Sequence, residues 1–200
     1  MNEELINKFG YSEMYEWSSI PEQEHRLGRF VQFDPEYPGK IKLCSDFNNI
    51  VGVTTVNTTV VSDDPAEWKH KNFSNEYGDL YLQKERLAVG GMEYDQENEI
   101  SFIRTRKWEH FIPVQNPNYK SDIEYTKRSN RVEWIRVNLI GKCVVEDDGT
   151  CVPGQYCTLY KGKLKAKQGT VKLATEKSEI KFYVLNRISP KTVTILYKNI

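Results

Sequence analysis

Three of the four cysteines gather in one short stretch, and their spacing tests for a metal site or a disulfide. Cys143, Cys151 and Cys157 lie within "KCVVEDDGTCVPGQYC", and Cys44 is distant in sequence. Structural zinc sites usually show two close pairs such as C-x₂-C, a spacing that is absent here. Each of the three histidines stands singly beside charged residues: His25, His70 and His110. We therefore expect no metal site. The cysteines are interpreted as buried free thiols, with a redox pair as the alternative.

The residues between the first two of these cysteines are typical of a tight turn. Asp148-Gly149 supplies the positive φ that a two-residue β-turn requires. "KCVV" before the turn and "TCV" after it have strand character. The pattern predicts a hairpin with its turn over residues 146–150. Cys143 and Cys151 would then lie on neighbouring strands and pack as small apolar residues.

No motif for nucleotide binding or nucleophilic hydrolysis is present. The chain lacks G-x-x-x-x-G-K-[ST], G-x-G-x-x-G and G-x-S-x-G. Gly90-Gly91 in "LAVGGME" is not followed by Lys-Ser or Lys-Thr and indicates a turn. The residues by themselves therefore predict no cofactor.

Charge and hydropathy exclude several further classes. The 28 basic and 28 acidic residues give a net charge of zero, which favours neither nucleic acid nor an anionic membrane as a partner. The longest apolar stretch, "NNIVGVTTVNTTVV", is interrupted by Asn, Thr and Gly, so no segment is predicted to span a bilayer. The N-terminus lacks the features of a signal peptide. A reducing compartment, in which disulfides are rare, is expected.

Short strand-like segments separated by Gly, Pro and Asp turns dominate the chain. The pattern predicts a mainly β fold, an antiparallel sandwich or barrel of short strands with a few short helices and long irregular loops. The segments with strand character are "RFVQF", "KIKLC", "IVGVTTV", "ISFIRTRKW", "IRVNLIGKCVVE", "TCVPGQYCTLY", "KLKA", "KFYVLNRI" and "TVTILYK", with "SPKT" as the final turn.

Helix and loop signals are fewer. Residues 1–20 begin with the helical spacing of Leu5, Ile6 and Phe9, whereas "YSEMYEWSS" fits a strand equally well. "SDDPAEWKH" carries the capping residues of a helix start. Residues 71–100 are polar and predict a loop or a projecting excursion. The stretch "PVQNPNYKSDIEYTKRSNRVEW" predicts a long irregular connection, a kind of segment that is often functional.

Several blocks in order carry a family resemblance. They are "YSEMYEW", "EHRLGRFVQFD", "NNIVGVTTVNTTVVSDDPAEWKHK" and "NPNYKSDIEYTKRSNRVEWIRVNLIGKCVVEDDGTCVPGQYCTL", followed by an apolar C-terminal strand pair. Over roughly residues 10–198 the chain resembles the peptidase G2 family. Members are intramolecular-chaperone autoproteolytic domains at the C-termini of phage β-helical tailspikes. The most specific part is "RSNRVEW…LIGK…DDGTC…GQYC".

The resemblance implies a definite activity. Members help three chains of a spike to find register, and then cut themselves off through a serine assisted by a nearby acid. A domain that trimerises readily raises the local concentration of the chains joined to it. Its removal leaves the spike kinetically trapped. For one member, a podovirus neck appendage, the family also implies an association with ATP.

The cleavage segment departs from the family pattern. Gly10 stands where aspartate is usual, and Asn7 lies close to the expected serine. Ser12 is the one nearby hydroxyl candidate, with Glu13 and Glu16 as acids, and without a base a serine hydroxyl is a poor nucleophile. We therefore expect a vestigial site. Residues 1–20 would be the remnant of the cleavage region, and residues 21–200 one β-rich chaperone-like domain.

These observations predict a viral structural or assembly protein. It would be a stand-alone, trimerising, tailspike-chaperone-like module that does not cleave itself. Its partners would be copies of itself, as a homotrimer, or other virion proteins. The expected location is the virion, or the host cytoplasm during assembly. Two alternatives stay open: an active autoproteolytic chaperone of a tail spike, and a minor capsid or lattice protein of a large DNA virus that reuses this fold.

Overall fold

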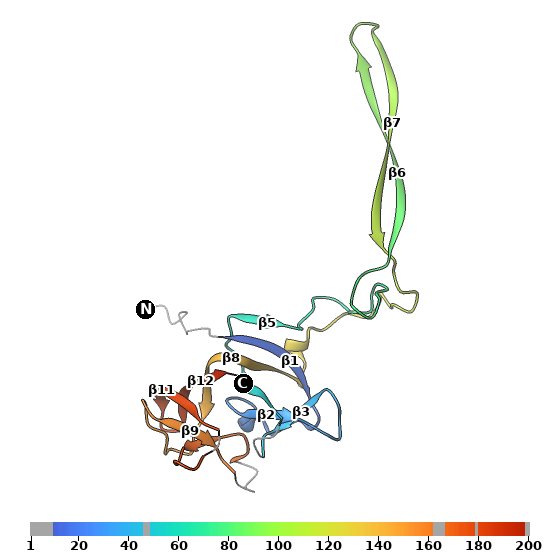
Figure 1. Cartoon of the computed structure of the whole chain (residues 1–200). Coiled ribbons are helices and arrows are strands. Elements are labelled where there is room, and N and C mark those ends of the chain that lie inside the picture. The colour runs from blue at the N-terminus through green and yellow to red at the C-terminus, as the bar shows by residue number, and fades with distance from the viewer. Residues whose placement is uncertain (1–9, 46–48, 162–166, 179, 199–200) are drawn as a thin grey trace. The chain divides into compact units, whose positions relative to one another are not determined.

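The computed structural model describes residues 10–45, 49–161, 167–178 and 180–198, and they group into two compact units. Unit 1 combines the chain up to residue 65 with residues 126 onward, and unit 2 is residues 66–125 (Figure 1). The division expected from the sequence, at residues 20 and 21, stays a prediction. Strand β1 (Tyr11–Trp17) lies within unit 1 and pairs with strands from both of its segments.

Strands account for nearly all regular structure in the described residues, so the predicted mainly β fold is confirmed. The helical elements are η1 (Gln23–His25) and η2 (Arg128–Asn130). No helix in the described part of the chain has the length and apolar character to cross a membrane. The remaining strands are β2 (Phe30–Phe33), β3 (Lys40–Leu43), β4 (Ile50–Thr55), β5 (Val60–Ser62), β6 (Leu82–Asp95), β7 (Ile100–Pro113), β8 (Trp134–Glu146), β9 (Tyr156–Leu159), β10 (Val171–Leu173), β11 (Phe182–Ser189) and β12 (Thr192–Lys198).

Five strands of unit 1 close into a small barrel. The sheet runs β8-β4-β2-β3-β1, and β1 pairs again with β8 in antiparallel register from Glu16↔Trp134 to Tyr11↔Ile140. Most pairs are antiparallel, as expected, whereas β1 runs parallel to β3 and β5. Each strand of the ring contributes to one apolar cluster, because alternate residues of a strand face the same side. Its buried members are Trp17, Val31, Ile41, Val51, Ile135 and Val137.

The C-terminal strands form a second apolar layer. β12 pairs with the last seven residues of β8, and the order continues β12-β11-β9-β10. Their buried side chains pack with Phe30 of the barrel, whose ring stacks on Phe182 with centroids 4.8 Å apart. The core of unit 1 therefore extends from the barrel into the C-terminal sheet.

Unit 2 is built around the hairpin β6–β7. Its two strands of 14 residues pair without a register shift, from Leu82↔Pro113 to Asp95↔Ile100. At the base, the Val114 amide donates to the Tyr81 carbonyl at 2.8 Å. Among residues 66–125, no described side chain is buried. The expectation of a loop or projecting excursion over 71–100 is therefore refined to one arm of a long hairpin.

Three local expectations are wrong. Gly90-Gly91, expected to form a turn, lies inside strand β6 and pairs with Thr105 and Arg104 of β7. Residues 63–70, which follow β5, form bends, turns and irregular backbone, because the carboxylates of Asp63 and Asp64 bind Arg128 and the Ser129 amide across the fold instead of capping a helix. The segment 146–150 does not join neighbouring strands, since β8 pairs with β12, and β9 pairs with β10 and β11. The predicted helical start over residues 1–9 and the "KLKA" strand lie outside the described residues.

Candidate functional site

Ser12, the candidate nucleophile, lies inside the fold. It is the second residue of β1, and none of its surface is exposed. Its Oγ lies 2.7 Å from Thr58 Oγ1 and donates to the Val60 carbonyl at 3.2 Å. A hydroxyl and a carbonyl cannot serve as the general base that a nucleophilic serine needs. No local signal marked Thr58, because it lies 46 residues further along the chain.

Glu13 belongs to the opposite face of the same strand, because successive side chains alternate. Its carboxylate accepts hydrogen bonds from Tyr11 Oη at 2.5 Å and from Tyr15 Oη at 3.2 Å. Burial, followed by the charge of Glu13, raises the pKa of Tyr15 to about 12. The hydrogen bond to Glu13 is the main cause that raises the pKa of Tyr11. Glu13 is thus held between two neutral phenols and directed away from Ser12.

Glu16 is committed to a different partner. Its Oε1 lies 2.6 Å from Lys40 Nζ, and the parallel register of β1 and β3 places these two residues side by side. Glu16 also lies four residues from Ser12, about 13 Å along an extended strand. The structure therefore brings none of the three candidate residues into contact with another.

Gly10, at the entrance to β1, occupies a position where no side chain fits. Its φ is +81°, and a Cβ there would lie 2.4 Å from the Ile140 carbonyl oxygen and 2.5 Å from Asn138 Oδ1. A Cβ on Gly141 would in turn lie 2.9 Å from Gly10 Cα. An aspartate, the residue that the family resemblance places at position 10, would clash with backbone here. Asn138 is buried, and its Oδ1 has no hydrogen-bond partner among the described atoms.

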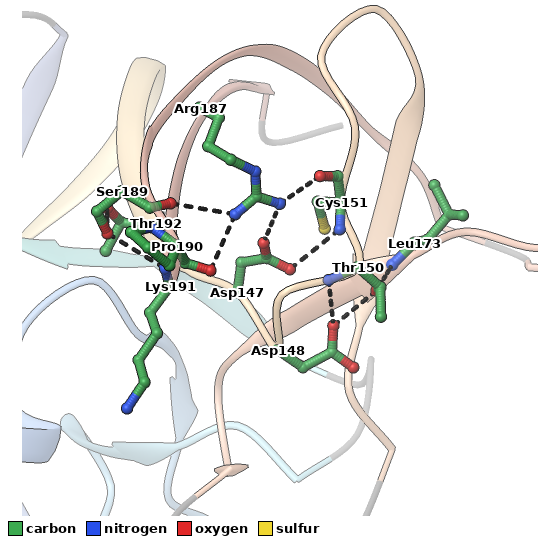
Figure 2. A network of polar contacts seen from close by, with 10 residues as sticks. All are labelled: Asp147, Asp148, Thr150, Cys151, Leu173, Arg187, Ser189, Pro190, Lys191 and Thr192. Atoms are coloured by element: carbon green, nitrogen blue, oxygen red, sulfur yellow. Dashed lines mark hydrogen bonds and ion pairs between the residues drawn. The ribbon is translucent and has the colours of Figure 1, made fainter.

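A buried ion pair organises the segment that was mistaken for a hairpin turn (Figure 2). The side chain of Asp147 is fully buried; its Oδ2 lies 2.6 Å from Arg187 Nη2 and its Oδ1 accepts the Cys151 amide at 3.2 Å. Arg187 also donates to the carbonyls of Cys151, Ser189 and Pro190. Burial by itself would raise the pKa of Asp147, but the hydrogen bonds from Cys151 and Arg187 outweigh it and lower that pKa. This network fastens the loop to β11.

Cys143, Cys151 and Cys157 are free thiols, and all four cysteines are buried, which confirms their interpretation as apolar core residues. Burial raises the pKa of Cys143 to about 12. The contact with Cys157, followed by burial, raises the pKa of Cys151. Since the thiolate is the reactive form, these protonated thiols are poor nucleophiles at neutral pH. The proximity of Cys151 and Cys157 leaves the redox alternative as a prediction.

Two other features of unit 1 are candidate binding sites, one for a metal ion and one for an apolar ligand or partner. Glu22, Glu24 and His25 bring possible metal-ligand atoms within 4.8 Å of one another, although His25 Nδ1 also lies 3.0 Å from Arg29 Nη2. A groove of about 810 Å³ on unit 1 exposes apolar side chains from several strands and loops. Its exposed apolar residues are Leu27, Val56, Val144, Leu185 and Ile188. An association with ATP, implied by resemblance, stays a prediction.

The sequence matches one family model over most of its length. The model is described as "Peptidase_G2, IMC autoproteolytic cleavage domain", and it matches residues 6–186.

The relatives and solved structures that resemble the chain come from phages. A preneck appendage protein of Bacillus phage PZA is 27% identical over 146 residues, and a pre-neck appendage protein of Bacillus phage B103 is 25% identical over 141. These matches cover 72% and 70% of this chain but 14% of each relative. The crystal structure of pre-mature bacteriophage phi29 gene product 12 has a TM-score of 0.62 at 20% identity, covering 95% of this chain and 21% of that one. The C-terminal fragment of that product has a TM-score of 0.61 at 21% identity, covering 94% and 99%.

Proposed function

The chain belongs to the Peptidase_G2 family, the IMC autoproteolytic cleavage domains, and on this premise we propose that it is an assembly domain of a phage appendage that associates as a homotrimer and does not cut itself. The observation that carries the proposal is the family match over residues 6–186. The names of the relatives, which are preneck appendage proteins, support a virion partner. A self-associating domain would hold the appendage chains together while non-local strand pairing, which is slow, takes place.

The arrangement around Ser12 supports the absence of self-cleavage. Its hydroxyl is buried against Thr58 and the Val60 carbonyl, and the Glu13 carboxylate belongs to the other face of β1. Gly10 leaves no room for a carboxylate at the entrance to the strand. A peptide would have to displace these contacts to reach the Ser12 Oγ.

Self-cleavage is the second candidate function, and membership of a family of autoproteolytic cleavage domains favours it. A fusion protein distinguishes the two. A reporter is placed before Met1 through a flexible linker of about 20 residues, and the product is followed by mass spectrometry. We expect the intact fusion in the native chain and in Ser12→Ala, with Ser19→Ala as an exposed control. A fragment that begins near Ser12 and disappears only in Ser12→Ala would overturn the inactive assignment.

The association is tested separately. Sedimentation velocity of the whole chain at about ten micromolar and above should give a trimer. Stable interfaces of standard size are populated in this concentration range. A monomer throughout that range would contradict the assembly function while leaving the family assignment intact.

A further inference from the structure

We propose that the hairpin β6–β7 is a self-association element, which packs against the same hairpin of a second copy of this chain. The inference rests on the proposed function, since it names the surface through which the copies would meet.

The side chains of unit 2 that the structure describes form no hydrophobic core. No described side chain between residues 66 and 125 is buried, and the two core clusters draw all their members from unit 1. An isolated two-stranded hairpin is marginally stable at best in water. A hairpin with 14 residues in each strand therefore gains stability if a further surface covers it, and a second copy of this chain can supply that surface.

Large apolar side chains are exposed on both faces of the hairpin. Leu87 and Trp108 lie directly opposite each other in the register, with 47% and 58% of their surface exposed. By strand alternation, Met92 and Phe111 belong to the other face, and they are 77% and 67% exposed. Leu87 and Trp108 thus form an exposed apolar pair, and exposed apolar patches mark interaction sites. A hairpin with apolar residues on both faces can be covered from two sides by neighbouring copies.

The edges of the hairpin point to the same kind of partner. Neither β6 nor β7 pairs with a third strand in the described residues, and their register contains no bulge. The sequence between Leu82 and Pro113 contains no proline that would protect an edge. An open, regular edge is completed by another open, regular edge, and a second copy brings one.

Charge argues for a copy rather than for a polyanion or a basic protein. Residues 82–113 contain five Lys or Arg and six Asp or Glu. Several of these charges are paired within the hairpin: Lys84 and Arg86 with Glu109, and Arg104 with Glu93. Because the basic and acidic residues nearly cancel, the hairpin has little net charge to attract an oppositely charged partner. For the same reason, two copies of the hairpin do not repel each other.

The hydrogen bonding at the base of the hairpin allows residues 82–113 to be deleted without disturbing the residues on either side. The Val114 amide already donates to the Tyr81 carbonyl, as in the closing bond of a two-residue turn. Residues 82–113 are replaced by Asn-Gly, the preferred two-residue hairpin turn. Sedimentation velocity compares this deletion with the whole chain at equal concentration, and near-UV circular dichroism reports whether the aromatic core of unit 1 remains packed.

Point variants of the undeleted 200-residue chain guard against a deletion that fails to fold. Trp108→Ser with Phe111→Ser removes one aromatic residue from each face, and Lys107→Ser is the matched control on the same strand. In a separate chain, Met92→Cys places a thiol on the exposed hairpin, and Glu176→Cys places one on unit 1. The native cysteines are buried, so a short bis-maleimide reports on the introduced thiol.

We expect the whole chain and Lys107→Ser to self-associate, and the deletion and the double serine variant to be monomers. Met92→Cys should cross-link to another copy at least tenfold faster than Glu176→Cys. Association that survives both the deletion and the double variant would overturn this inference and leave the proposed trimer standing, with the groove on unit 1 as the next surface to test. A monomeric native chain would overturn the proposed assembly function as well, so the two failures are distinguishable.

Discussion

Asp147 and Arg187, 40 residues apart in sequence, form an ion pair of 2.6 Å in which the carboxylate is fully buried. The same guanidinium binds three backbone carbonyls, and the same carboxylate accepts a backbone amide (Figure 2). A carboxylate buried with this many partners stabilises the fold as long as all of them are present.

Arg187→Met should strongly destabilise the protein, because it leaves Asp147 charged and buried without its cation. With Arg187 partly exposed, we expect a loss of about 2–3 kcal/mol in the free energy of unfolding, measured by urea denaturation at fixed protein concentration. The control is Lys40→Met, which breaks the more exposed pair with Glu16 and should cost about 0.5 kcal/mol. Equal losses in the two variants would contradict the role given to burial.

The stability contributed by Asp147 should depend on pH in the acid range. Its pKa in the folded state lies below the ordinary value of 3.8, so the contribution is complete above that value and is lost as the pH falls through the folded pKa. We expect the free energy of unfolding of the native protein to fall below about pH 4 more steeply than that of Asp147→Asn. Parallel pH profiles for the two proteins would show that Asp147 makes no linked contribution.

Gly10→Ala should destabilise unit 1 by about 3 kcal/mol, because a Cβ at this position meets the backbone of Ile140 as well as an unfavourable positive φ. Gly39→Ala is the matched control. Gly39 has a φ of +83° but no atom within 4 Å of its Cβ position, so that variant should lose only about 1 kcal/mol. Thermal unfolding, monitored by circular dichroism, measures the stability of both variants, and the difference between them reports the steric effect alone. A loss of stability in Gly10→Ala no larger than that in Gly39→Ala would argue against the close approach of Gly10 to the Ile140 backbone.

The thiols should be unreactive in the folded protein. Burial and a raised pKa keep Cys143 and Cys151 protonated, and Cys44 and Cys157 are also buried. Titration with a chromogenic disulfide at pH 8 should detect almost no rapid reaction under native conditions and all four thiols in denaturant. Rapid modification of one thiol in the native state would identify an accessible cysteine and support the redox alternative.

Much of the fold could be predicted from local pattern. The alternating and apolar segments around residues 30–33, 40–43, 50–55, 182–189 and 192–198 are strands, as expected. These segments are identified by side-chain periodicity and by turn residues, both of which act within a few positions of the chain. The burial of Cys143 was predictable for the same reason, because it alternates with exposed residues in β8, whereas Cys44 and Cys151 are buried outside the strands.

The predicted helix start and the predicted hairpin turn were wrong for the same reason, which is that long-range contacts hold both segments. Asp63 and Asp64 have the residue types of a helix cap, but Arg128 and the Ser129 amide bind them from a distant part of the sequence. Asp148-Gly149 has the residue types of a hairpin turn, but Arg187 holds the neighbouring Asp147 and β8 continues into a pair with β12. In both segments a tertiary partner outcompeted the local preference.

The candidate site shows the same division. The sequence by itself determined the family, the strand that carries Ser12, and the departure at Gly10 from the family pattern. Only the tertiary structure decided that Ser12 is buried against Thr58, that Glu13 is held by two tyrosines, and that position 10 has no room for a side chain. Strand alternation can assign residues to opposite faces of a strand, but it does not say which face meets a core. That choice, and the choice of the β8 residues that close the barrel against β1, depend on pairing between segments more than 100 residues apart. Local sequence carries no record of that pairing, because its free energy comes from contacts that exist only after the chain has folded.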